Sequence, residues 1–143
     1  MIKVGVIGAA GRMGAAACAA IAAADGLQLV AAVDAAPGVT AEGITISKEL
    51  RALAAAHVDV AIDFTVAAAS RINLPWLAMH SIHAVVGTTG FTQDDFDTFK
   101  KSFTNSNCLI AANFAVGAVL MMRFAEMAAP FFDTAETIEV HHD

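Results

Sequence analysis

At 143 residues, the chain has room for one domain with a hydrophobic core and at most part of a second. Hydrophobic residues make up 57% of it, many of them alanine, and this composition excludes a disordered chain. The formal net charge is -6, and the lysines and arginines are scattered instead of forming one basic stretch. That distribution argues against a nucleic-acid partner.

Two features indicate the compartment. Cys18 and Cys108 lie far apart in apolar surroundings, which favours buried free thiols of a reducing compartment over a disulfide. Lys3 and the apolar residues after it resemble the start of a secretory signal, but Arg12 interrupts that run. The longest uncharged apolar stretch, 108–122, is shorter than the ~20 residues of a membrane-spanning helix. We therefore expect a cytoplasmic protein without a membrane partner.

The first third of the chain predicts a strand, a helix and a second strand. Residues 2–7 are an apolar strand that runs into Gly8. Residues 12–24 are nearly all helix formers, and Asp25-Gly26 ends that helix. Residues 27–33 form a near-continuous apolar run, the pattern of a strand buried on both faces of a parallel sheet.

The middle of the chain continues this alternation. Residues 37–46 predict a loop, and Ser47 is expected to cap a helix that ends at residue 56. Residues 58–64 predict a third strand. A helix is expected over residues 66–80. We expect Pro75 to interrupt it, because proline lacks the amide donor that a helix interior needs.

Five more elements are predicted toward the end of the chain. They are a strand at 82–86, a helix capped by Thr92 that ends at 103, a strand at 108–112, a helix at 115–132 and a sixth strand at 137–142.

Strands and helices that alternate in this way predict a Rossmann-like, doubly wound α/β fold with a parallel sheet. Ligands of such sheets bind beyond the carboxyl ends of the strands. The residues at those ends are Gly8 to Gly14, Asp34, Phe64-Thr65, Gly87 to Gly90 and Asn113-Phe114.

The three glycines Gly8, Gly11 and Gly14 stand between the first strand and the first helix. Glycine permits a tight turn there and lets backbone amides approach a pyrophosphate at the positive end of the helix. Ala10 occupies the position of the second glycine in the usual G-x-G-x-x-G spacing. The turn predicts NADH or NADPH as cofactor, and a glycine turn without a ligand is the alternative.

Asp34 lies 20 residues after Gly14, where a carboxylate can accept hydrogen bonds from the adenine ribose. A carboxylate should repel a 2'-phosphate, although Arg12 could offset this repulsion. The pattern favours NADH and leaves NADPH open. The alternative interpretation of Asp34 is an aspartate that only ends a strand at a turn.

Two further groups of residues could carry chemistry. Gly87 to Gly90 offer backbone donors and the hydroxyls of Thr88 and Thr89, which could hold a nicotinamide carboxamide or form a turn without a ligand. His141 and His142 alternate along a predicted strand, and no third ligand follows them nearby, so we expect no metal site. The pKa of His141 can lie near neutral pH, as a general acid requires.

Together the motifs resemble the N-terminal portion of the dihydrodipicolinate reductases, also called 4-hydroxy-tetrahydrodipicolinate reductases, of bacterial lysine and diaminopimelate biosynthesis. The resemblance spans essentially the whole chain, and its short length before Val58 is similar to the actinobacterial branch. The motifs are VGVIGAAGRMG (4–14), IDFT (62–65), VVGTTGF (85–91), AANFAVG (111–117) and EVHH (139–142).

The resemblance implies NAD(P)H-dependent reduction of 4-hydroxy-tetrahydrodipicolinate, a cyclic dicarboxylate, to tetrahydrodipicolinate. It implies that full-length members are homotetramers. It also assigns the site residues: Gly8, Ala9, Ala10, Gly11, Arg12 and Met13 for the pyrophosphate, Asp34 for the ribose, Gly87, Thr88, Thr89, Ala111, Ala112, Asn113 and Phe114 around the nicotinamide, His141 as proton donor and His142 as a substrate-binding residue.

The chain departs from the family pattern in two places. Ala112 replaces a proline of the nicotinamide loop, and the chain stops at Asp143, before the lysine and the Gly-Thr pair that bind substrate carboxylates. We therefore expect a dinucleotide-binding domain at 1–113 and the truncated start of an α+β substrate and oligomerisation domain at 114–143. Such a fragment should bind cofactor weakly and turn over little.

Two alternatives remain. One is a non-catalytic dinucleotide-binding module, such as a redox sensor or scaffold. The other is the cofactor domain of a different nicotinamide enzyme, for example homoserine or aspartate dehydrogenase. The pair His141-His142 argues against the module, and this pair together with the 87–91 motif weighs against the other enzyme.

Overall fold

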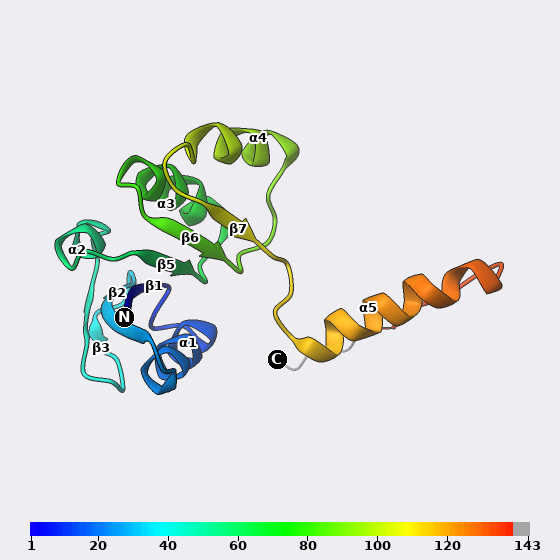
Figure 1. Ribbon diagram of the computed structural model, residues 1–143, viewed down its shortest axis with the longest axis horizontal. Coiled ribbons are helices and arrows are strands. Elements are labelled where there is room, and N and C mark those ends of the chain that lie inside the picture. The colour runs from blue at the N-terminus through cyan, green and yellow to red at the C-terminus, as the bar shows by residue number, and fades with distance from the viewer. Residues whose placement is uncertain (139–143) are drawn as a thin grey trace. The chain divides into compact units, whose positions relative to one another are not determined.

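The computed structural model describes residues 1–138 of the chain. They belong to two compact units, Met1–Ala112 and a second unit that starts at Asn113. The first unit holds a seven-stranded sheet with helices, and the second contains one long helix (Figure 1). The mostly parallel, Rossmann-like sheet confirms the predicted fold class of the first unit. Whether residues 114–143 begin an α+β substrate domain stays a prediction.

The elements of the first unit follow one another as β1 (Ile2–Ile7), α1 (Arg12–Ala23), β2 (Leu27–Val33), β3 (Gly38–Val39), β4 (Thr45–Ser47), α2 (Arg51–Ala55), β5 (Val60–Asp63), α3 (Ala67–Met79), β6 (His83–Val86), α4 (Gln93–Ser102) and β7 (Cys108–Ile110). The strand order in the sheet is β3-β4-β2-β1-β5-β6-β7. Every pair is parallel except β3 with β4. The second unit contains α5 (Val116–Ala128) and a 3-10 turn (Ala129–Phe131).

Six strands of the first unit end in one row of paired residues. The row is formed by Ser47, Val33, Ile7, Asp63, Val86 and Ile110. Backbone hydrogen bonds continue past it: the amide of Gly8 donates to Val33 at 2.8 Å, and the amide of Phe64 donates to Ile7 at 3.0 Å. The turns that follow the strands are therefore held side by side along one edge of the sheet.

The direction of the chain reverses at the middle of the sheet. From β1 it passes to β2 on one side, and it later returns to β5 on the other side of β1. In doubly wound sheets such a point leaves a crevice between the two diverging connections. The crevice expected here lies between the turn after Ile7 and the turn after Asp63.

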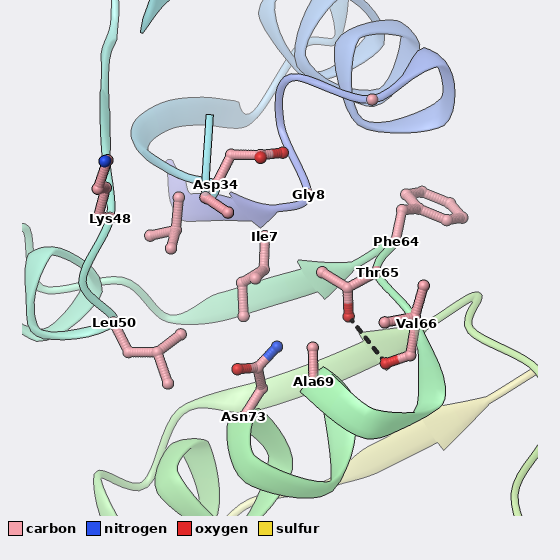
Figure 2. A pocket seen from close by; sticks show the side chains of 13 residues that line it. Ile7, Gly8, Asp34, Lys48, Leu50, Phe64, Thr65, Val66, Ala69 and Asn73 are labelled. Carbon is pink, nitrogen blue, oxygen red and sulfur yellow. Dashed lines mark hydrogen bonds between the residues drawn. The ribbon is translucent and has the colours of Figure 1, made fainter. Parts of the chain in front are cut away.

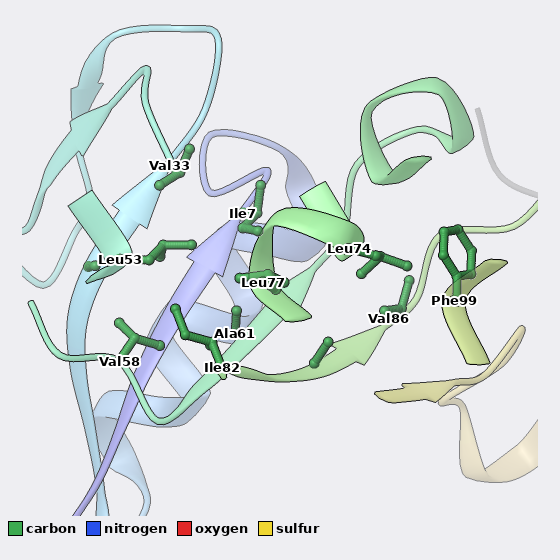
Figure 3. Close-up of a cluster of buried hydrophobic side chains, with 12 residues drawn as sticks. Ile7, Val33, Leu53, Val58, Ala61, Leu74, Leu77, Ile82, Val86 and Phe99 are labelled. Carbon is green, nitrogen blue, oxygen red and sulfur yellow. The ribbon is translucent and has the colours of Figure 1, made fainter. Parts of the chain in front are cut away.

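Two apolar clusters fill the two faces of the sheet. On one face the sheet packs against α2, α3 and α4, through side chains such as Leu53, Leu77 and Phe99 (Figure 3). On the other face Cys18 and Ile21 of α1 pack against β1 and β2. Burying one Leu or Ile side chain fully stabilises a fold by about 1.5–3 kcal/mol. These clusters fix the sheet and hence the position of its carboxyl edge.

Thr92 caps α4 as predicted. Its hydroxyl accepts a hydrogen bond from the amide of Asp95 at 3.3 Å, and the Asp95 carboxylate accepts one from the amide of Thr92 at 2.7 Å. This reciprocal pair satisfies amides that the first turn of a helix leaves unpaired. The helix therefore starts at a fixed residue, just after the turn of residues 87–90.

The loop expected at 37–46 is wrong, because this segment contains β3 and the start of β4. Ser47 is the last residue of β4 and not an N-cap; its hydroxyl accepts a hydrogen bond from the amide of Glu49 at 3.1 Å in a turn. The helix begins only at Arg51 and has five residues. Strands of two and three residues are too short to show a period. They form here because β4 pairs with β2 and β3 pairs with β4.

Pro75 does not interrupt its helix, contrary to the expectation, because α3 continues through it to Met79. Leu74 and Leu77 on either side are fully buried, and this packing outweighs the local cost of proline. The predicted strand at 137–142 is wrong for Thr137 and Ile138, which are in no strand, and its remaining residues lie outside the described ones. The other predicted elements form where expected, with somewhat different ends.

The second unit offers little buried surface of its own. None of the side chains of α5 is buried in the structure. No described helix of either unit is long and apolar enough to cross a membrane. Residues 1–112 therefore carry the packed core on which the described part of the chain depends.

Leu77 and Met79 of α3 give a matched test of this core. Leu77 is fully buried, whereas Met79 is 73% exposed. We expect Leu77→Ala to lower the free energy of unfolding by about 2–5 kcal/mol, and Met79→Ala to change it by less than about 0.5 kcal/mol. Urea unfolding of the two variants measures this difference. Equal effects would contradict the described packing of α3.

Candidate dinucleotide site

The turn between β1 and α1 is built by close backbone contacts. Gly8 has φ +82°, and a Cβ atom on it would collide with the carbonyl oxygen of Phe64. A Cβ atom on Gly14 would collide with the carbonyl oxygen of Gly8. A Cβ on Gly11 meets only this same oxygen, at 3.3 Å. Gly8 and Gly14 are therefore required by the turn itself, whereas a Cβ atom at Gly11 would need only a small shift of the backbone.

A pocket of about 500 Å³ lies at the point where the sheet reverses direction (Figure 2). Its lining residues come from the ends of β1, β2, β4 and β5 and from the start of α3. They are Ile7, Gly8, Gly11, Val33, Asp34, Ala35, Lys48, Leu50, Phe64, Thr65, Val66, Ala69 and Asn73. The predicted residues Gly8, Gly11 and Asp34 thus share one pocket, as the rule for doubly wound sheets requires.

Asp34 is fixed against the glycine turn. One carboxylate oxygen accepts a hydrogen bond from the amide of Ala10 at 3.0 Å, and the other accepts one from the amide of Ala36 at 2.9 Å. A carboxylate oxygen has a second lone pair, so both can still accept from a ligand. The amide of Ala10, by contrast, is already bound within the protein.

Asp63 is fully buried and joins two turns of the carboxyl edge. Its Oδ1 accepts hydrogen bonds from the amide of Thr65 at 3.0 Å, from the hydroxyl of Thr65 at 2.6 Å, from Ser70 at 3.2 Å and from Thr88 at 3.3 Å. Its Oδ2 accepts one from Asn73 at 2.9 Å. A buried carboxylate is stable only with such partners. This network ties the turn after β5 to the turn after β6.

Sequence reasoning missed this role of Asp63. In the sequence it is only one member of the IDFT motif. The signal for it was a single acid at the end of an otherwise apolar strand, beside hydroxyl and amide side chains in the next helix turns.

The network changes what Thr88 can do. Its hydroxyl donates to Asp63 and accepts from the amide of Thr65 at 3.1 Å, and the residue is 4% exposed. Thr89, in contrast, is exposed. Of the two hydroxyls expected to meet a ligand, only that of Thr89 is free to do so in this arrangement, and Thr88 holds the turn.

Arg71 of α3 braces the far end of the same turn. Its guanidinium donates to both carboxylate oxygens of Asp95, at 2.8 and 2.9 Å, and to the carbonyl of Gly90 at 3.4 Å. The bidentate bond to Arg71, with further hydrogen bonds from Thr92, holds the pKa of Asp95 well below its usual range. Residues 87–90 are thus fixed at both ends.

The other predicted site residues are placed less completely. Ala111 lies beside β6, because its amide donates to Val86 at 3.0 Å. Asn113 belongs to the second unit, where its side chain accepts from the amide of Ala115 at 2.9 Å. Around the glycine turn, Ala9 is buried, whereas Ala10, Arg12 and Met13 are exposed. Ala112 is exposed at the end of the first unit, and Phe114 belongs to the second unit. His141 and His142 lie outside the described residues.

Neither cysteine thiol is ionised to a nucleophilic thiolate at neutral pH. Both are free thiols, and burial raises the pKa of Cys108 to about 11, with the charge of Asp63 adding to the effect. Burial and Glu42 also raise the pKa of Cys18. Both thiols therefore stay protonated at neutral pH. Residues 1–138 contain no group of three His, Cys, Asp or Glu side chains that could hold a metal ion.

Comparison with known proteins gives consistent matches. A family model described as dihydrodipicolinate reductase, N-terminus, matches residues 2–114. The 4-hydroxy-tetrahydrodipicolinate reductases of Cutibacterium acnes and Nocardia farcinica are 45% and 47% identical over 99% of this chain. The match covers 54% of each of these relatives, so the chain spans about half the length of the curated proteins it resembles.

Solved structures include a member of the same family. The dipicolinate-bound dihydrodipicolinate reductase from Paenisporosarcina sp. TG-14 superposes with a TM-score of 0.81 at 29% identity, over 92% of this chain and 55% of that one. GenD2 from gentamicin A biosynthesis, in complex with NAD, gives a TM-score of 0.72 at 18% identity, over 90% of this chain and 40% of that one. The second likeness concerns the fold alone.

The Asp63 network can be tested by removing its acceptor. Asp63→Ala leaves several buried donors without a partner, so we expect the free energy of unfolding to fall by about 3 kcal/mol or more. Asp63→Asn keeps one acceptor oxygen and should cost about 1 kcal/mol. Urea unfolding measures both.

Asp97→Ala is the control, because Asp97 lies on the surface of α4 and, among the described residues, accepts a hydrogen bond from Gln93 alone. It should change the free energy of unfolding by less than about 0.5 kcal/mol. If Asp63→Ala were as mild as Asp97→Ala, the network would not hold the two turns together.

Proposed function

Because the chain belongs to the dihydrodipicolinate reductase family through a match over residues 2–114, we propose that it is the dinucleotide-binding part of an enzyme that reduces 4-hydroxy-tetrahydrodipicolinate with NADH or NADPH. The observation that carries the proposal is the pocket in which the glycine turn and Asp34 meet.

The residues of the turn fit a dinucleotide. At Gly8 and Gly14 the backbone packs too closely for a Cβ atom, and the start of α1 offers amides and the positive end of the helix dipole. We assign the pyrophosphate to residues 8–13. Asp34 then lies at the adenosine side, where its fixed oxygens accept hydrogen bonds from ribose hydroxyls.

We assign the nicotinamide end to Gly87, Thr89 and residues 111–114. The amide of Ala111 donates a hydrogen bond to the carbonyl of Val86, which places Ala111 beside Gly87 at the carboxyl edge of the sheet. When bound there, the nicotinamide supplies the hydride, and the protein supplies its orientation. The Asp63 network and the Arg71 brace keep residues 87–90 in place for that contact.

The family resemblance supplies the rest of the proposal. His141 serves as proton donor and His142 binds a carboxylate of the substrate, and a histidine can do the first because its pKa lies near neutral pH. The relative from Paenisporosarcina sp. TG-14 is bound to dipicolinate, a dicarboxylate, which supports a substrate of this class. The free thiols support a cytoplasmic location, and a homotetramer stays a prediction from the family.

Titration with NADH tests the cofactor assignment. We expect Asp34→Ala to raise the Kd for NADH by about 10-fold, because the ribose loses a charged acceptor. Asp25→Ala, an acid at the end of α1 on the opposite edge of the sheet, should leave the Kd unchanged. Isothermal titration measures both, with circular dichroism to confirm that the variants fold. An unaltered Kd in Asp34→Ala would remove Asp34 from the site.

Oxidation of NADH in the presence of 4-hydroxy-tetrahydrodipicolinate separates the enzyme from a binding module. The proposal expects a low, substrate-dependent rate that disappears in His141→Asn while NADH binding persists. Binding of NADH without any substrate-dependent oxidation would instead favour the non-catalytic module. Absence of binding to both NADH and NADPH would contradict the proposed function altogether.

A further inference from the structure

The register of β4 brings Lys48 next to Asp34. Val33 of β2 pairs with Ser47 of β4, and the amide of Asp34 donates to the carbonyl of Ser47 at 2.9 Å. Neighbouring strands of a sheet lie about 4.8 Å apart. Asp34 and Lys48 are the residues that follow this last pair, and both line the pocket (Figure 2).

The ammonium group of Lys48 has no ionic partner among the described residues. The carboxylate of its neighbour Glu49 is paired with Arg51. Lys48 is exposed, so its long side chain is free to move toward an anion beside Asp34. Arg12, the other cation near the glycine turn, does not line this pocket.

Asp34 by itself should disfavour a 2'-phosphate. Its two oxygens are held in place by Ala10 and Ala36, so the carboxylate cannot turn away without losing those bonds. A cation at the same end of the pocket offsets the repulsion between the carboxylate and a second anion. Lys48 is the one lysine or arginine among the pocket's lining residues.

We propose that Lys48 is the specificity residue for the adenosine 2'-phosphate, so that the site accepts NADPH through Lys48 and NADH through Asp34. This inference rests on the proposed function, because it concerns the adenosine end of the same site. Lys48 contributes to the binding of the phosphorylated cofactor only, since the 2'-hydroxyl of NADH carries no charge for it to meet.

Direct titration of the chain with NADPH and NADH tests this inference. Lys48→Gln should raise the Kd for NADPH by about 10-fold and the Kd for NADH by less than about 2-fold. Lys48→Arg should retain the affinity for NADPH. Lys101→Gln removes the same charge from the exposed surface of α4 and should affect neither cofactor. Added salt should weaken the binding of NADPH in the unaltered chain more than in Lys48→Gln.

Three outcomes would overturn the assignment of Lys48. They are an unchanged Kd for NADPH in Lys48→Gln, an equal loss of both cofactors, and a selective loss of NADPH in Arg12→Gln with none in Lys48→Gln. If the unaltered chain bound NADH normally in these cases, the proposed function would stand. If it bound neither cofactor, the proposed function would fail first, and the role of Lys48 with it.

Discussion

The common register of the parallel strands is the constraint on which the rest of the molecule depends. Ser47, Val33, Ile7, Asp63, Val86 and Ile110 form one row across the sheet. Since the strands end together, the turns after them must lie side by side. The glycine turn, Asp34 and the turn of residues 87–90 are far apart in sequence, and this row places all three at the same end of the sheet.

Backbone pairing in this row would still leave the turns free to move. The hydrogen bonds accepted by the side chain of Asp63 hold two of them in place. Its burial costs free energy, which five hydrogen bonds offset. The donors come from the turn after β5, from α3 and from Thr88. Apolar packing under α2, α3 and α4 then holds the sheet to which these groups are attached.

Local sequence rules predicted much of this arrangement. The glycine turn and the Thr92 cap depend on residues close in sequence, and both form as expected. Asp34 lies in one pocket with Gly8 and Gly11, at the carboxyl ends of the strands where the pattern put it. The rest depends on pairing between distant segments. Strands β3 and β4 exist only through their partners, the helix with Pro75 persists only because its neighbours are buried, and Lys48 and Thr88 acquire their surroundings only once β4 and β5 are in register.

The β3–β4 hairpin has a consequence for how such a protein can change. It joins the rest of the sheet through two residue pairs, and of its residues only Ile44 and Ile46 pack against a core cluster. Substitutions at its end therefore touch few interactions that stabilise the fold. A change of cofactor preference through residues at the end of this hairpin therefore requires no change at Gly8, Gly14 or Asp63, on which the turns of the site depend.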